Sequence, residues 1–175
     1  MANIDDFKAK LTGGGARANY FKVICNFPAG INVNGANEIG SFLIKNASLP
    51  ASTIGMFEIP FRGRKLKLAG DRTFDQYSIT VLNDVGFTIR NAFERWMNSI
   101  SQHVNNVGLD NANDYQSDII VQQLNRNEDI LKQYTLRGAF PINISAIELS
   151  AEAADTIEEF TVDLQYQYWT SDTTT

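Results

Sequence analysis

The sequence predicts an α+β fold that is mainly β, namely an antiparallel β-sandwich or barrel with one flanking α-helix and a long β-hairpin. Several segments of the 175-residue chain alternate apolar and polar residues with the period of two that a half-buried strand requires. One segment alone repeats its apolar residues at strong helical spacing. Two further strand-like segments are separated by a short Arg-Gly turn, which is the pattern of a hairpin.

The strand pattern is clearest in 160–168, where apolar and polar side chains alternate at every position. Aromatic and β-branched residues, which favour strands, are abundant elsewhere too. The Asn- and Gly-rich segment 30–38 is expected to be a loop. A break is expected at Phe140-Pro141, because proline has no N–H to donate to a strand ladder. The other strands are expected at 18–27, 41–48, 73–83, 118–124, 130–139 and, as a short one, 142–149.

The expected hairpin joins 53–61 to 64–68 through the turn Arg62-Gly63. Leucines alternate with lysines along its second arm. Lysines on such a strand oppose uncontrolled pairing at its edge.

One α-helix is expected between 87 and 101, where apolar residues form a single stripe that would cover one face of a sheet. Asp84 precedes this segment and is a good residue to cap its first turn. The stripe consists of Ile89, Ala92, Phe93, Trp96, Met97 and Ile100.

The chain is expected to form one domain over 18–170, preceded by a flexible segment 1–17 and followed by a fraying tail 171–175. The run Gly13-Gly14-Gly15 predicts a flexible joint in the first segment. The single cysteine, Cys25, excludes an intrachain disulfide and is expected to be a small buried residue. Neither a signal peptide nor a membrane span is indicated, so we expect a soluble protein made in a reducing cytoplasm.

Charge is distributed unevenly along a chain whose net charge is −5. No Lys or Arg follows Arg137, whereas basic residues cluster in the hairpin region. Two interpretations remain open: complementary surfaces that meet between copies, or two solvated surfaces of a monomer.

The residues needed for common enzyme chemistry are not grouped in this sequence. His103 has neither a second histidine nor a nearby cysteine with which to hold a metal. The glycine run lacks the Lys and Ser/Thr of a phosphate-binding loop. Glu158 and Glu159 are neighbours in a strand pattern and would point to opposite faces. We therefore expect no enzyme activity and no cofactor, and the acidic chain is a poor candidate for binding duplex DNA.

Several short motifs, in order, resemble the tail tube proteins of contractile-tailed, T-even-like bacteriophages. The resemblance extends from about residue 20 to 169, and the chain departs from the family in 13–38 and 103–116. It is carried by Leu49-Pro50-Ala51, Ile59-Pro60-Phe61, Arg64-Lys65-Leu66, the run 69–75 (AGDRTFD), the run 80–84 (TVLND), Phe93 with Trp96, the run 136–141 (LRGAFP) and Tyr168-Trp169.

The resemblance implies a structural protein that self-assembles into stacked hexameric rings. These rings would form the rigid inner tube of the virion tail, with a sheath protein around it and baseplate and terminator proteins at its ends. Phage DNA would pass along the lumen without specific binding, and no direct membrane insertion is implied. The alternative is the inner tube of a bacteriocin, an extracellular injection device or a type VI secretion device that carries effectors. A soluble monomeric β-type binding module is the competing class.

Two sets of residues are candidates for roles in such a tube. The basic hairpin region would contact the acidic C-terminal portion of another copy, and acidic residues would face the lumen and repel DNA. The acidic residues have a second interpretation, at the outer surface or the ring interface. The inter-subunit candidates are Arg62, Arg64, Lys65, Lys67 and Arg72, and the lumen candidates are Glu148, Glu152, Glu158, Glu159 and Asp163.

Overall fold

The computed structural model describes residues 3–11, 15–31 and 35–174. Gly13 and Gly14 of the predicted joint lie outside these residues. The helices are α1 (Ile4–Lys10), α2 (Ala36–Leu43), α3 (Thr88–Ile100) and α4 (Ala112–Tyr115). The strands are β1 (Phe21–Cys25), β2 (Ile44–Asn46), β3 (Thr53–Phe61), β4 (Arg64–Thr73), β5 (Tyr77–Leu82), β6 (Ser117–Leu124), β7 (Ile130–Ile144), β8 (Glu159–Gln165) and β9 (Tyr168–Ser171).

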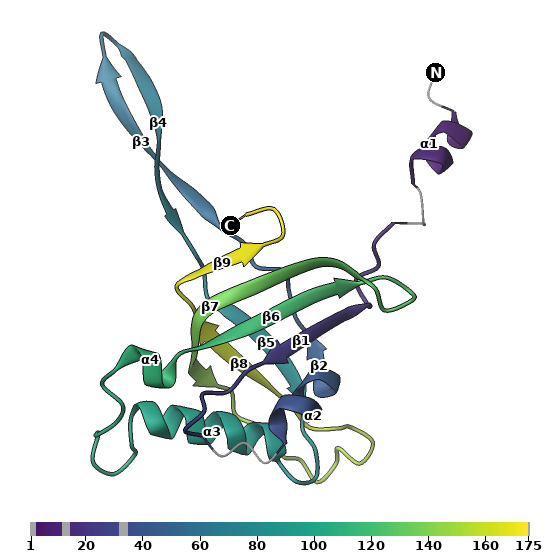
Figure 1. Cartoon of the computed structure of the whole chain (residues 1–175), viewed down its shortest axis with the longest axis vertical. Helices are drawn as coiled ribbons and strands as arrows, with labels where there is room; N and C mark the ends of the chain where they lie inside the picture. The colour runs from purple at the N-terminus through teal and green to yellow at the C-terminus, as the bar shows by residue number, and fades with distance from the viewer. Residues whose placement is uncertain (1–2, 12–14, 32–34, 175) are drawn as a thin grey trace.

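The body is one curled antiparallel sheet with the strand order β1-β6-β7-β8-β5-β2, and β9 adds to β7 (Figure 1). Strand β7 connects the part of the sheet that contains β1, β6 and β9 to the part that contains β8, β5 and β2, because it changes partner along its length. Its residues 134–136 pair with both β6 and β9, and its residues 140–144 pair with β8. Helix α2 packs against β1 and β2, the two ends of this order. The predicted fold class, an antiparallel barrel-like body with a flanking helix and a long hairpin, is confirmed.

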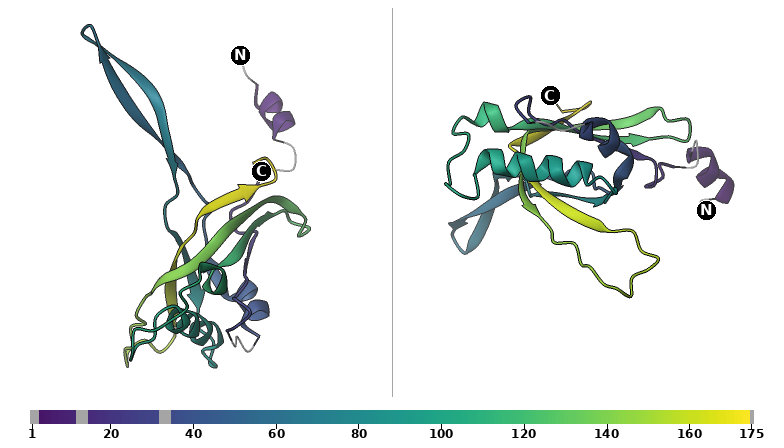
Figure 2. Two further views of the ribbon diagram at one scale, coloured as in Figure 1. Left: turned by 60° about the vertical axis from the view of Figure 1, so that its left-hand side comes forward. Right: turned by 90° about the horizontal axis from the view of Figure 1, so that it is seen from below.

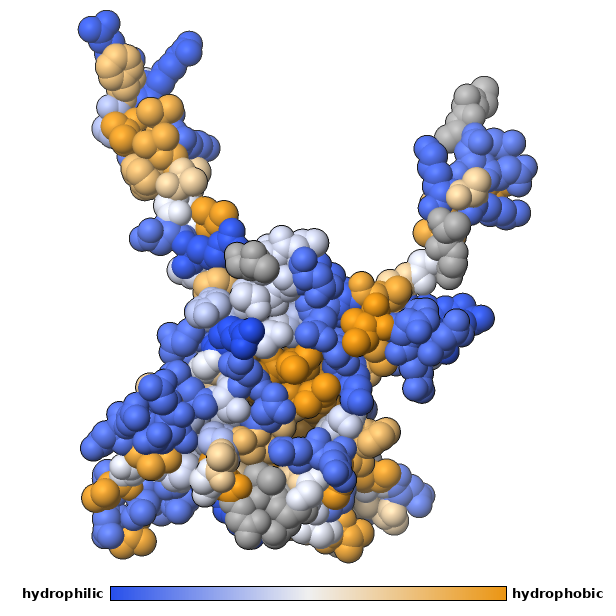
Figure 3. All heavy atoms as spheres, viewed as in Figure 1, coloured by the Kyte–Doolittle hydropathy of each residue, from blue (hydrophilic) through white to orange (hydrophobic). Residues whose placement is uncertain are grey.

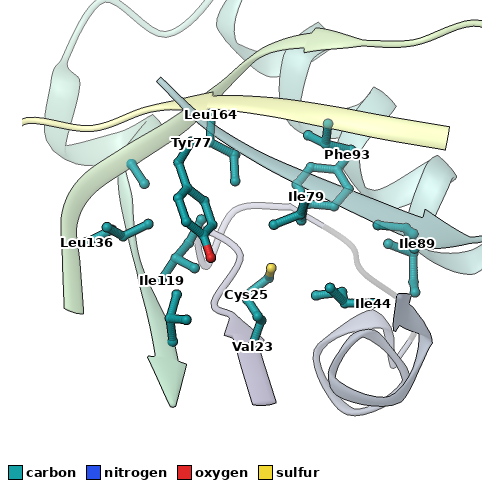
Figure 4. Packing of buried hydrophobic residues seen from close by; sticks show 14 of the residues in the cluster. Val23, Cys25, Ile44, Tyr77, Ile79, Ile89, Phe93, Ile119, Leu136 and Leu164 are labelled. Carbon is teal, nitrogen blue, oxygen red and sulfur yellow. The ribbon is translucent and has the colours of Figure 1, made fainter. Parts of the chain in front are cut away.

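The core lies on the concave side of the sheet, where alternate residues of the strands point inward (Figure 4). Helix α3 lies across the lower end of the sheet and packs against β7 (Figure 1). The predicted stripe of this helix is confirmed, since Ile89, Ala92, Phe93 and Trp96 are buried. Asp84 accepts a hydrogen bond of 2.9 Å from the backbone N–H of Thr88, so it satisfies a free donor at the helix start, although the N-cap position itself is Phe87.

The predicted strand 41–48 is wrong, and so is the end of the predicted loop 30–38. Residues 36–43 form helix α2, and only residues 44–46 form strand β2. A short apolar run fits a helix and a strand equally well, so tertiary contacts decide between them. Here the helix covers the gap between β1 and β2.

Other expectations about strands also need correction. Strand β7 continues through Pro141, because its register with β8 shifts between Pro141 and Asn143, and a proline is tolerated at such an irregularity. The predicted strand 142–149 is therefore only the end of β7, and residues 145–158 form a loop. The predicted strand 160–168 is divided, because β8 pairs with β5 while β9 pairs with another part of β7. Strands β1 and β5 are shorter than predicted, and the short helix α4 lies in the expected loop 103–114. Strand β4 is longer than the predicted arm 64–68, because its pairing with β3 continues to Thr73 opposite Thr53.

The β3–β4 hairpin and helix α1 both project from the same end of the body, at the top of the views that share its long axis (Figures 1 and 2). The loop 145–158 lies at the opposite end, near α3 (Figure 1). None of the described helices combines the length and the hydropathy needed to cross a lipid bilayer.

Candidate assembly surfaces

The β3–β4 hairpin has an apolar face that is exposed to solvent. Residues paired across an antiparallel ladder lie on the same face, so the register places Phe57 beside Leu68 and Ile59 beside Leu66. Phe61 continues the same alternation toward the tip. These five residues, the apolar hairpin face, are each between 37% and 66% exposed. Figure 3 shows hydrophobic residues gathered along the projecting hairpin, away from the body.

The opposite face of the hairpin is charged. Glu58 lies opposite Lys67, and Lys65 lies opposite Pro60. The ammonium group of Lys65 forms an ion pair of 2.6 Å with Glu58. An exposed ion pair of this kind contributes about 0–1 kcal/mol to stability, so it leaves these side chains free to take other partners.

The five basic candidates all lie on the hairpin, but they are distributed along it. Lys65 and Lys67 share the charged face, whereas Arg62 and Arg64 stand at the tip. The Arg62 guanidinium lies 5.4 Å from the centre of the Phe61 ring, and its residue has a positive φ of 45° in the turn. Arg72 lies near the base of the hairpin, opposite Ile54.

The five acidic candidates do not form one surface. Glu148 and Glu152 lie in the loop 145–158, and Glu158 at its end accepts a hydrogen bond of 2.8 Å from Asn83. Glu159 and Asp163 lie on strand β8.

The carboxylates on β8 have partners on neighbouring strands. Glu159 forms an ion pair of 2.6 Å with Lys45 on β2. Asp163 accepts hydrogen bonds from Ser78 on β5 and from Asn143 on β7. Their strand neighbours Phe160 and Val162 are buried, so these carboxylates belong to the outward face of the sheet.

The ends of the sheet offer backbone groups for further pairing. Within the described residues β1 pairs only with β6, β2 only with β5 and β9 only with β7. An unpaired strand edge presents N–H and C=O groups to any strand that reaches it.

Helix α1 was not predicted to carry a functional surface. Its apolar side chains Ile4 and Phe7, together with Leu11 just beyond its end, recur at i, i+3 and i+7 and therefore form one stripe. They are 66%, 65% and 44% exposed. This spacing can be read from the sequence, but three apolar residues over two turns predict a helix only weakly, because so short a helix is marginally stable in water.

The shifted pKa values belong to the core. Burial raises the pKa of the Cys25 thiol to about 12. The pKa of Tyr77 is raised mainly by burial and, to a smaller extent, by the nearby Cys25. The Tyr77 hydroxyl donates a hydrogen bond of 2.7 Å to the carbonyl of Ser48. In the part of the chain that the structure describes, no three His, Cys, Asp or Glu side chains are grouped so as to hold a metal ion.

A packed body that carries an uncovered apolar hairpin, open sheet edges and a projecting amphipathic helix defines a subunit of a larger assembly. The chain belongs to the phage tail tube protein family, whose model matches residues 16–172. It is therefore a structural component of the virion tail, as its sequence motifs indicated.

Two relatives show how much of the chain the likeness covers. The chain is 30% identical to the tail tube protein of Serratia phage KSP90 over 174 residues, which is 98% of each chain. It is also 30% identical to tail tube protein gp19 of Enterobacteria phage T4 over 168 residues, which is 95% of this chain and 98% of the T4 protein.

The fold also occurs in solved assemblies. A chain of the anti-feeding prophage baseplate matches with a TM-score of 0.64 and 17% identity, over 90% of this chain and 95% of that one. A chain of the sheath–tube complex of an extracellular contractile injection system, PVC, matches with a TM-score of 0.64 and 15% identity, over 93% of this chain and 95% of that one. At these identities the likeness shows the shared fold.

Proposed function

We propose that copies of this chain form hexameric rings that stack into the tail tube, and that the hairpin joins neighbouring copies. The observation that carries this proposal is the apolar hairpin face. A two-stranded hairpin alone is marginally stable in water, and this one exposes Phe and Leu side chains that gain free energy when buried. The exposed apolar side chains of this hairpin are explained if another copy of the chain covers them.

The basic residues of the hairpin would meet carboxylates of a neighbouring copy. The candidates remain Arg62, Arg64, Lys65, Lys67 and Arg72, which belong to the projecting hairpin (Figure 1), with Arg72 near its base. Such contacts attract over a distance that shrinks as salt screens the charges.

Reversal of charge at Lys65 and Lys67 to Glu tests this contact. We expect the double variant to assemble less than the wild type at low salt, with the difference shrinking at high salt. The variant also breaks the Lys65–Glu58 pair, so Glu58→Gln is the matched control, which removes that pair without adding an acid. Sedimentation of assembled protein across a salt series measures the effect. Equal assembly of all three proteins at low salt would exclude the contact.

Partners are proposed from the assemblies that share the fold. One solved structure is a sheath–tube complex, another a baseplate and a third a tube-terminating cap. We propose that sheath, baseplate and terminator proteins likewise contact this chain, and that its role is structural and not catalytic. The phage origin of its relatives favours DNA over effectors as cargo.

For the lumen we now favour Glu159 and Asp163 among the five acidic candidates. Both lie on the outward face of the sheet, whereas Glu148 and Glu152 stand on a loop away from it. Carboxylates along the channel would keep DNA phosphates from adhering.

A phage carrying Asp163→Lys tests the lumen proposal. It should eject DNA more slowly or incompletely, and Glu152→Lys in the loop is the control with the same charge change. Normal ejection by the Asp163 variant, with tubes intact, would remove Asp163 from the lumen.

A further inference from the structure

The loop 145–158 borders an open pocket at the end of the body opposite to α1 (Figure 1). The pocket has a volume of about 650 Å³ and is lined by residues 146–151, 153 and 156–159. Leu149 and Ile157 are 80% and 67% exposed, so apolar surface is available there. Glu148, Glu158 and Glu159 contribute carboxylates to the same lining. Glu158 and Glu159 already have partners in their own chain, Asn83 and Lys45. The pocket therefore combines apolar and acidic side chains in one open depression.

Helix α1 carries the complementary pattern. On a helical projection of 100° per residue, Ile4, Phe7 and Leu11 form one narrow stripe. Lys8 lies along one side of this stripe and Lys10 along the other. The acids Asp5 and Asp6 occupy the remaining surface. An apolar stripe between two lysines complements a pocket that offers both apolar side chains and carboxylates.

We propose that α1 of one copy docks into the pocket formed by residues 145–158 of a second copy, as a head-to-tail contact between successive layers of the tube. This inference rests on the proposed tube. The two surfaces lie at opposite ends of the long axis (Figures 1 and 2), so stacking copies along that axis brings one toward the other. A contact between two different patches of identical chains propagates in this way.

The hairpin fits this pocket less well than α1 does. Its lysines Lys65 and Lys67 lie on the face opposite to the apolar hairpin face, which has Arg64, opposite Phe61 at the tip, but no lysine along its sides. Helix α1 offers apolar residues and lysines on one surface. A helix of seven residues is also unstable by itself in water, so burial of its stripe would stabilise it.

The connection to the body is long enough for such an arm. Ten residues, 11–20, lie between α1 and strand β1. Arg17 and Tyr20 are hydrogen-bonded to β6, so about six residues before Arg17 form the free part of the arm, and a fully extended chain of that length spans roughly 20 Å. The arm therefore reaches beyond the contour of its own subunit.

Crosslinking tests the contact directly. Phe7→Cys and Leu149→Cys are made in separate chains, which are mixed, assembled and treated with a short bismaleimide. The native Cys25 is buried and its pKa is raised, so it does not compete for the reagent. We expect covalent dimers in the mixture and few in either variant alone. The double variant in one chain should give a ladder of linked copies, and a link confined within single chains would overturn the proposal.

A matched pair of substitutions tests the energetic role. Phe7→Asp places a charge in the stripe, and Ala9→Asp places the same charge on the far side of α1. We expect Phe7→Asp to weaken stacking by about tenfold or more, the factor that ~1.4 kcal/mol per contact gives, and Ala9→Asp to leave it near wild type. Tube length by negative-stain microscopy is the readout.

The outcomes separate this inference from the proposed function. If the wild type forms tubes and Phe7→Asp tubes are equally long, the α1 contact is wrong and the tube stands. If Lys8→Glu shortens the tubes and Glu148→Lys in the same chain restores them, the contact is supported. If the wild type forms no tube even with its tail partners, the proposed function itself fails.

Discussion

The body and the hairpin are built from similar residues but bury them very differently. In the body, Phe93, Trp96 and Leu164 are completely buried. In the hairpin every residue of β3 is exposed, and so is every residue of β4 except Gly70. The body is thus stabilised within one chain, whereas the hairpin is left to gain its burial from another molecule. The first set of contacts governs folding, and the second governs assembly.

The largest loss of stability is expected when an aromatic side chain is removed from the core of the body. Trp96 packs against Phe27 and Phe93, and its indole N–H donates a hydrogen bond of 2.7 Å to the carbonyl of Tyr115. We expect Trp96→Ala to lower the free energy of unfolding by ~3–5 kcal/mol. Urea unfolding of dissociated protein measures this, and a loss below ~1 kcal/mol would show that the body is not the stabilising unit.

High pH should weaken the body through its buried ionisable groups. A raised pKa in the folded state means that the unfolded state releases its proton first, so stability falls as pH rises. For Cys25 this window runs from pH 9.0 to about 12. The loss is at most about 1.4 kcal/mol per pH unit for one group.

Cys25→Ala should flatten this slope, and Tyr77 should account for part of what remains, since its pKa is raised as well. Chemical unfolding at a series of pH values provides the measurement. An unchanged slope in the variant would show that Cys25 does not stay buried.

A smaller effect is expected at the start of α3. Asp84 accepts hydrogen bonds from both the backbone N–H and the hydroxyl of Thr88. Asp84→Ala should therefore cost about 1 kcal/mol of unfolding free energy. Asp84→Asn keeps an acceptor and should lose less; equal losses in the two variants would argue against the capping role.

The smallest effect on stability, with a large effect on assembly, is expected in the hairpin. Ile59→Asp alters the apolar hairpin face and should change the unfolding free energy of dissociated protein by no more than ~0.5 kcal/mol. It should nevertheless abolish long tubes. Glu58→Asp, which places the same residue on the charged face, is the control. A variant that unfolds easily, or that still assembles normally, would contradict the division between folding and assembly.

The sequence was most informative where a pattern is long or has a clear boundary. The stripe of α3, the first arm of the hairpin and its turn were predicted nearly to the residue, since periodicity and the Arg62-Gly63 turn depend on local chemistry. The second arm was predicted only as far as residue 68, whereas β4 continues to Thr73. Helix α2 and the path of β7 through Pro141 were missed, because both depend on which strand lies beside them.

The candidate surfaces were predicted in part. The sequence located the basic residues on the hairpin, and the structure adds that Lys65 and Lys67 share one face while the apolar residues share the other. It did not indicate that Glu148 and Asp163 belong to different surfaces, because their separation depends on how the loop 145–158 leaves the sheet.

Negative-stain electron microscopy of the purified chain is the most direct test of whether copies cover one another's hairpins to build a tube. The wild type should form hollow rings that stack into tubes, and a variant whose hairpin is replaced by a short turn between residues 53 and 73 should form a folded body that does not stack. Tubes built equally well without the hairpin, or a wild type that stays monomeric beside its tail partners, would contradict the account.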